Sequence, residues 1–124
     1  MFPSVYIVED DEYLRIVIGE YLHTQGYIVS IFETGEKALK HLMKSTKEDL
    51  PKLIVLNIEM YDALSFFEKI SSKDFSMPFY ILYKDKEKLK KLNSEKIVFG
   101  RGPINLKEMA DTINNRLHHL NVQL

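Results

Sequence analysis

The chain has 124 residues, which is enough for one domain with a real core and too short for two. Apolar residues make up 45% and charged residues 28%, and a net charge of −1 gives no global attraction to nucleic acid or anionic membranes. The absence of cysteine excludes disulfides, thiolate metal sites and cysteine nucleophiles. The N-terminus lacks the basic region of a signal peptide and no apolar run is long enough to span a bilayer, so we expect a cytoplasmic location.

Strands and helices alternate from the start of the chain. A continuous apolar run at residues 5–8 predicts a strand buried on both faces. Apolar residues then recur at helical spacing as far as Gly26, which is typical of a helix C-terminus. Residues 27–32 are rich in β-branched and aromatic side chains and predict a second strand. Thr34 is placed to cap the helix that follows.

The same alternation continues to the C-terminus. The further expected elements are a strand at 53–56, a helix capped by Asp62, a strand at 79–83, a lysine-rich helix at about 85–92, a strand at 97–99 and a last helix opened by the capping-box pair Asn105 and Glu108. Five strands alternating with five helices predict an α/β fold, with a parallel sheet covered on both faces. We expect one domain over residues 1–124 with its core at about 4–119.

Four segments resemble the motifs of response-regulator receiver domains, the signalling modules of bacterial two-component phosphorelays. These segments are VYIVEDDEYLR at 5–15, TGEKAL at 34–39, the strand that ends at Asn57, and GPINL at 102–106. The resemblance covers nearly the whole chain. It implies a flavodoxin-like three-layer fold with a five-stranded parallel sheet of order 2-1-3-4-5.

In that family two acids after the first strand help to hold Mg²⁺, and an aspartate after the third strand accepts a phosphoryl group. A hydroxyl after the fourth strand and a lysine after the fifth hydrogen-bond that group. The resemblance places Glu9 and Asp10 at the acid pair, Asn57 at the acceptor, Tyr83 at the hydroxyl and Gly102 at the lysine. Three of these five positions depart from the family pattern.

Each departure has a chemical consequence. The amide of Asn57 carries no anionic nucleophile, so it cannot form an acyl phosphate, and it offers Mg²⁺ only a neutral oxygen. Tyr83 displaces its hydroxyl by the length of a ring, and Gly102 removes a cation. Because phosphoryl transfer depends on positioning and charge stabilisation, we expect a pseudo-receiver that is not an enzyme and requires no cofactor.

The acids at 9–11 allow two interpretations. In one, Glu9 and Asp10 bind Mg²⁺; in the other, the cluster caps the first helix, and we favour the second because Asn57 weakens the site. A further hypothesis is that Lys84 folds across the mouth of the pocket and pairs with Asp10 or Asn57 as a substitute cation. The alternative is a solvated lysine, since exposed ion pairs contribute little.

Three further features follow from the resemblance. Tyr83 and Phe99 occupy the switch pair, either as locked bulky rings or as ordinary core aromatics. Pro103 follows Gly102 where the family has a cis bond, so we expect a cis-proline. The segment from Tyr83 to Gly102 is a few residues shorter than in the family, which predicts a short or poorly ordered fourth helix.

We expect the module to act through protein contacts, on the surface of the last two helices and the fifth strand. A homodimer and an output domain further along a longer chain are compatible with that surface, whereas a membrane or direct nucleic-acid contact has no support. The basic stretch is either a dock for an acidic partner or a solvated helix face, and we favour the second; it comprises Lys84, Lys86, Lys88, Lys90, Lys91 and Lys96.

Two rival functions remain open. One is phosphoryl transfer through a non-standard acid, with Asp10 or Asp62 as the acceptor. The other is a small-molecule sensor that uses the vacated pocket, against which the bulk of Tyr83 and Lys84 argues. The pair His118 and His119 has no third ligand at a convincing spacing, so a zinc site is not expected.

Overall fold

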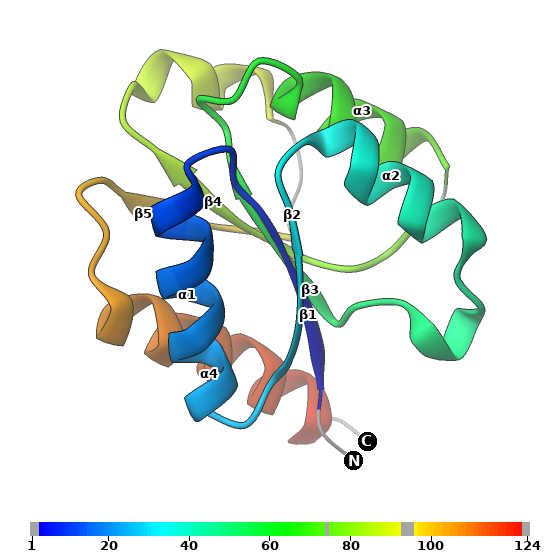
Figure 1. Cartoon of the computed structure of the whole chain (residues 1–124), viewed down its shortest axis with the longest axis vertical. Helices are drawn as coiled ribbons and strands as arrows, with labels where there is room; N and C mark the ends of the chain where they lie inside the picture. Colours follow the sequence, from blue (N-terminus) through cyan, green and yellow to red (C-terminus); the bar gives the residue numbers. More distant parts are fainter. Residues whose placement is uncertain (1–2, 74, 93–95, 123–124) are drawn as a thin grey trace.

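The computed structural model describes residues 3–73, 75–92 and 96–122, with the backbone alone for 119–122. Five parallel strands form one sheet of order β2-β1-β3-β4-β5, so the expected strand order is confirmed (Figure 1). The strands are β1 (Ser4–Val8), β2 (Ile28–Phe32), β3 (Leu53–Asn57), β4 (Phe79–Tyr83) and β5 (Ile97–Arg101). Each lies within about two residues of its predicted position.

Helices cover both faces of the sheet, which gives the three expected layers. The α-helices are α1 (Glu12–Thr24), α2 (Gly35–Lys44), α3 (Ala63–Ser72) and α4 (Leu106–Val122), and two 3-10 helices are η1 (Lys47–Asp49) and η2 (Lys86–Lys91). α1 and α4 pack on one face and α2 and α3 on the other (Figure 1). In the described part of the chain, none of the helices has the length and apolar character needed to cross a bilayer.

The alternation of side chains along the strands divides the core into two layers. In β1, Val5 and Ile7 point to the α1 and α4 side, while Tyr6 and Val8 point to the α2 and α3 side. All four side chains are buried, which is why this strand reads as an unbroken apolar run. The two layers fix the sheet, and with it the edge where the functional positions meet.

The element between β4 and β5 is a 3-10 helix, η2, rather than the predicted α-helix. It spans six residues, none of them fully buried, and only Leu89 packs against the core, which is too little apolar contact to favour an α-helix. Asp85 caps it by accepting a hydrogen bond from the backbone N–H of Glu87 at 3.0 Å. The short fourth helix expected from the loop length is therefore confirmed in this form.

Asp62 does not cap its own helix with its side chain, contrary to the prediction. It occupies the N-cap position of α3, but its carboxylate accepts hydrogen bonds from the backbone N–H groups of Gly35 and Glu36, at 3.0 and 2.9 Å. Thr34 caps α2 as predicted, through the N–H of Lys37. The first turn of α2 therefore has two acceptors, one of them a carboxylate at the positive end of the helix.

The close approach of α2 and α3 requires glycine at position 35. A Cβ at Gly35 would lie 2.7 Å from the Cβ of Phe66. We expect Gly35→Ala to lower the free energy of unfolding by about 1–3 kcal/mol, because the added methyl must push two helices apart. Urea denaturation measures the change. Gly19→Ala in α1 is the matched control, because its Cβ would meet Ile31 at an ordinary 3.4 Å; equal losses in both variants would refute the steric explanation.

Candidate functional site

The carboxyl ends of β1 and β3 bring Glu9 and Asn57 into direct contact. The Nδ2 group of Asn57 donates to both carboxylate oxygens of Glu9, at 3.0 Å each. The Oδ1 atom of Asn57 accepts the backbone N–H of Glu59 at 2.9 Å. Because that N–H can only be met by an oxygen, the amide is oriented with its NH₂ toward Glu9.

Glu9 is a buried carboxyl group, with 1% of its surface exposed. Besides Asn57, the backbone N–H of Asp11 donates to it at 3.1 Å. Burial raises the pKa of Glu9, the hydrogen bonds from Asn57 and Asp11 oppose that rise, and the nearby Asp10 adds to it. Asn57 thus supplies the neutral donor that allows an acid to be buried at this edge of the sheet.

The other two acids of the cluster have different environments. Asp11 is the N-cap of α1 and accepts the N–H of Leu14 at 3.0 Å, which agrees with the capping interpretation. Asp10 is exposed. Arg15 reaches back from α1 to donate to the backbone carbonyl of Glu9 at 2.8 Å, so the loop is tied to the helix.

These residues are a poor donor set for Mg²⁺. The ion prefers carboxylate and water oxygens, but Asn57 turns its NH₂ toward the site and both oxygens of Glu9 already accept hydrogen bonds. Within residues 3–73, 75–92 and 96–122, no three His, Asp or Glu side chains are grouped as metal ligands. The geometry therefore does not fit the divalent ion that the family resemblance implies.

A small pocket of about 280 Å³ remains where the phosphoryl group would lie in a working receiver. Its lining includes Glu9, Asn57, Tyr83, Lys84 and Gly102. The peptide bond between Gly102 and Pro103 is cis. The pocket walls are mostly apolar, with Leu14, Leu82 and Ile104 completing the lining.

Lys84 covers Gly102 but does not neutralise the acids. A Cβ at Gly102 would stand 3.4 Å from Lys84 Cγ, so the aliphatic part of this lysine fills the space of the missing side chain. Among the described residues, however, no carboxylate lies within ion-pair distance of the Lys84 ammonium group. The hypothesis that Lys84 pairs with Asp10 or Asn57 is therefore wrong: within the described residues its ammonium group forms neither an ion pair with Asp10 nor a hydrogen bond with Asn57.

Tyr83 and Phe99 contact each other edge to face, with ring centroids 6.1 Å apart and planes at 88°. Tyr83 is half-buried, whereas Phe99 is 47% exposed. The pair is therefore not a pair of ordinary core aromatics, since one ring faces solvent on β5. Its geometry is the favourable one for two aromatic rings.

Glu59 joins the loop after β3 to the loop after β4, a role that the sequence analysis did not assign to it. Its Oε2 atom accepts the backbone N–H groups of Lys84 and Asp85, at 2.9 and 3.2 Å. Its Oε1 atom pairs with the ammonium group of Lys88 at 3.0 Å. One carboxylate therefore fixes the start of η2. A signal was available: Glu59 is the next acid after the strand end at Asn57, at the edge where Lys84 also falls.

The surroundings of the two glutamates shift their pKa values in opposite directions. Partial burial alone would raise the pKa of Glu59, but the donors from Lys84, Asp85 and Lys88 together lower it. We expect Glu9 to titrate above and Glu59 below the ordinary glutamate value of about 4.5. Side-chain carboxyl ¹³C NMR over a pH series measures both. A reversed order of Glu9 and Glu59 would contradict the contacts described.

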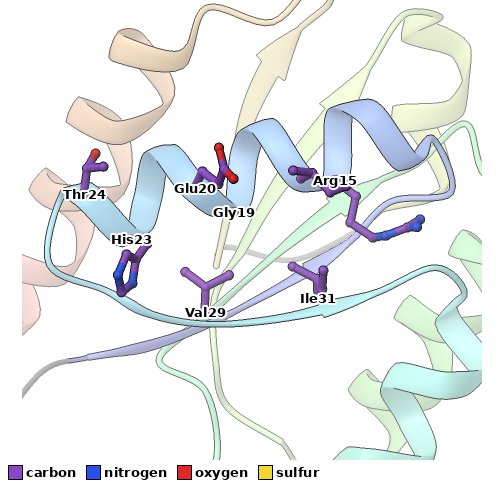
Figure 2. A pocket seen from close by; sticks show the side chains of 8 residues that line it. Arg15, Gly19, Glu20, His23, Thr24, Val29 and Ile31 are labelled. Atoms are coloured by element: carbon purple, nitrogen blue, oxygen red, sulfur yellow. The ribbon is translucent and has the colours of Figure 1, made fainter.

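A larger cavity of about 660 Å³ lies away from these residues, between α1 and the edge strand β2 (Figure 2). Val29 and Ile31 point from β2 toward α1 in Figure 2, and Gly19 leaves room above them. Arg15, Glu20 and His23 form its rim. It includes none of the positions that the family resemblance assigns.

Comparison with known proteins supports the resemblance to receiver domains. No protein-family profile matches the chain. It is 30% identical over 82 residues to the C4-dicarboxylate transport transcriptional regulatory protein DctD of Rhizobium meliloti, covering 64% of this chain and 17% of that protein. It is 29% identical over 124 residues to a cyclic di-GMP phosphodiesterase of Thermotoga maritima, covering 94% and 33%. The chain thus spans a third or less of these relatives.

The structural comparison establishes the fold. The response regulator receiver domain protein (CheY-like) from Methanospirillum hungatei matches with a TM-score of 0.83 over 100% of both chains, at 16% sequence identity. The chain therefore has the fold of response-regulator receiver domains.

Proposed function

We propose that this chain is a receiver-type module of a two-component response regulator that works without phosphorylation and through protein contacts. The observation that carries the proposal is the pair of hydrogen bonds from Asn57 to the buried carboxyl of Glu9. At the acceptor position an amide stands in place of the nucleophilic carboxylate, and it is bound to Glu9. It also occupies the acid that would otherwise hold the metal.

The chemistry of phosphoryl transfer supports the same proposal. A transferred phosphoryl group needs an anionic acceptor and cations or donors that balance its charge. Here the acceptor position is an amide, Gly102 has no cation, and the ammonium of Lys84 is not directed to the acids. Asp62, a rival acceptor, already accepts two helix N–H groups.

Glu59 supports the proposal from the other side of the site. In a working receiver the phosphoryl group links the loops after the third and fourth strands. In this chain a carboxylate links them through the N–H groups of Lys84 and Asp85. An internal anion of this kind holds the loops in one arrangement. The contact surface near η2 and β5 therefore has its binding conformation without phosphorylation.

Contacts of the module are proposed on α4, β5 and η2. The apolar ring of Phe99 on β5 is exposed on that surface. A homodimer, or an output domain on a longer chain, would cover it. We place the module in the cytoplasm, as for response regulators in general.

The test uses beryllofluoride, a phosphate mimic, with Mg²⁺ and amide NMR of the ¹⁵N-labelled chain. We expect no saturable shifts at Glu9, Asn57 or Tyr83, because the mimic must bond to an aspartate oxygen. A phospho-accepting receiver domain in the same buffer is the positive control. Saturable shifts around Asn57 would contradict the proposal.

The pocket of about 280 Å³ favours one second function, the binding of a small ligand. Its lining is mostly apolar and includes the polar side chains of Glu9, Asn57, Tyr83 and Lys84, although the pocket is slightly smaller than most ligand pockets. Thermal-shift screening of metabolites tests it, since a ligand of the folded state raises the apparent stability. A hit that is lost in Gly102→Leu, which would fill the pocket, would support this function.

A further inference from the structure

A groove separates the loop after β3 from η2, on the side of the molecule that α3 shares. Its volume is about 460 Å³. Ile58, Met60, Tyr61 and Leu64 line one wall, and residues of η2 line the other. We name it the α3–η2 groove. We propose that it binds an acidic segment of a protein partner, anchored by an apolar side chain.

The first wall provides the apolar anchor. Ile58 and Met60 are almost completely buried and form the base, while the ring of Tyr61 is fully exposed beside them. Exposed aromatic rings next to a preformed apolar depression are a composition that protein interfaces favour. A leucine or phenylalanine side chain from a partner would bury the Tyr61 ring and fill the groove.

The second wall provides the charge. Residues 84–91 contain five lysines and two acids, a net charge of +3 in a chain of net charge −1. Lys88 and Lys91 line the groove. Lys88 pairs with Glu59 and Lys90 with Glu87, whereas in the described chain no carboxylate lies within ion-pair distance of Lys86 or Lys91. The ammonium group of Lys91, which lines the groove, is therefore available to a carboxylate of a partner, and Lys86 lies outside the lining on the same short helix.

Glu59 ties this charged wall in place. Its bonds to the backbone of Lys84 and Asp85 fix the start of η2, and its bond to Lys88 holds that lysine at the rim. The groove is therefore shaped before a partner arrives, which lowers the ordering cost of binding. A partner that binds the α3–η2 groove would therefore contact the loops whose arrangement Glu59 fixes.

An acidic protein segment fits the groove better than nucleic acid does. Nucleic-acid sites gather many cations along a phosphate backbone, but here two lysines are already paired within the chain. Glu87, which lines the groove, is paired with Lys90, so few unpaired cations remain to follow a phosphate backbone. The buried base of Ile58 and Met60 suits an aliphatic or aromatic side chain. The inference rests on the proposed function and adds to its contact surface a second one, on the other side of η2, with the chemistry of the partner that it would bind.

The test is an amide NMR titration with a synthetic peptide in which leucine and phenylalanine are flanked by glutamates. Two comparison ligands are the same peptide with both apolar residues changed to serine, and a single-stranded DNA oligonucleotide. We expect saturable shifts at Met60, Tyr61 and Lys91 with the first peptide. The serine peptide and the DNA should bind at least about tenfold more weakly, a difference of about 1.4 kcal/mol.

Matched variants localise the binding. Lys91→Glu and Tyr61→Ala should each lower the affinity for the peptide by about fivefold or more. Lys52→Glu and Tyr13→Ala make the same chemical changes at exposed positions outside the groove and should leave the affinity unchanged. All four side chains are exposed, so none of the variants should unfold the chain.

Three results would overturn the inference: no saturable binding of the apolar peptide at concentrations of about 1 mM, equal losses in the control variants, or tighter binding of DNA at the same residues. The beryllofluoride experiment on Asn57 is independent of all three. If the peptide does not bind in the groove and beryllofluoride causes no shifts at Asn57, the assignment of the partner is wrong but the proposal of a phosphorylation-independent module stands. If beryllofluoride causes saturable shifts around Asn57, the proposed function itself is wrong.

Discussion

Asn57→Asp should lower the free energy of unfolding by about 2–4 kcal/mol near pH 7, and it should not enable the chain to accept phosphate. The substitution replaces the Nδ2 group, which donates to both oxygens of Glu9 at 3.0 Å, with an oxygen. A buried carboxylate then loses two hydrogen bonds and gains a like charge at contact distance. Phosphate acceptance would still lack the lysine that Gly102 replaces and the compact hydroxyl that Tyr83 replaces.

The loss should depend on pH. Burial already raises the pKa of Glu9, and a neighbouring aspartate would raise it further. A carboxyl with a raised folded-state pKa contributes stability that is fully present below its unfolded value of about 4.5 and is lost as the pH rises through the folded pKa. The variant should therefore approach the wild type near pH 4 and diverge from it toward pH 7.

Urea denaturation at several pH values measures this effect. Asn105→Asp is the matched control, because Asn105 accepts the N–H of Glu108 at the start of α4, where a carboxylate caps equally well. Mg²⁺ should stabilise Asn57→Asp more than the wild type, since the new pair of carboxylates suits the ion. A variant as stable as the wild type at pH 7, or one phosphorylated by a small phosphodonor, would contradict the role given to Asn57.

Glu59→Gln should release the loop that begins η2. The glutamate accepts two backbone N–H groups on one oxygen and an ammonium group on the other, and an amide can accept on only one side. We expect a local loss of about 1–3 kcal/mol, seen as faster hydrogen exchange of the Lys84 and Asp85 amides. Glu68→Gln, at an exposed position on α3, is the control. Unchanged exchange at both amides would show that Glu59 does not hold the loop.

The fold could be predicted from the sequence because its signals are local. Unbroken apolar runs mark strands that are covered on both faces, and β1 shows why, since alternate residues enter two separate core layers. The helix type of η2 could not be predicted. A lysine-rich stretch is typical of a helix, but because only Leu89 packs against the core, tertiary contacts decide which helix forms. Here Asp85 and Glu59 fix its start through hydrogen bonds.

The site was only half predictable. The chemical consequences of Asn57 follow from its side chain alone, but the direction of its amide depends on the N–H of Glu59. Lys84 has the charge of a substitute cation, yet its aliphatic part lies over Gly102, in the space of the missing side chain. No local sequence pattern predicts this packing contact. Asp62 satisfies another helix rather than its own, a contact between residues 27 positions apart that no local pattern encodes.

That contact of Asp62 also bears on how the chain opens. A carboxylate at the start of α3 holds the first amides of α2, and Gly35 allows the two helices to touch. If the first turn of either helix opens, the hydrogen bonds between the Asp62 carboxylate and the N–H groups of Gly35 and Glu36 are lost. The two should therefore open as one cooperative unit, with their amides exchanging at a common free energy rather than fraying separately.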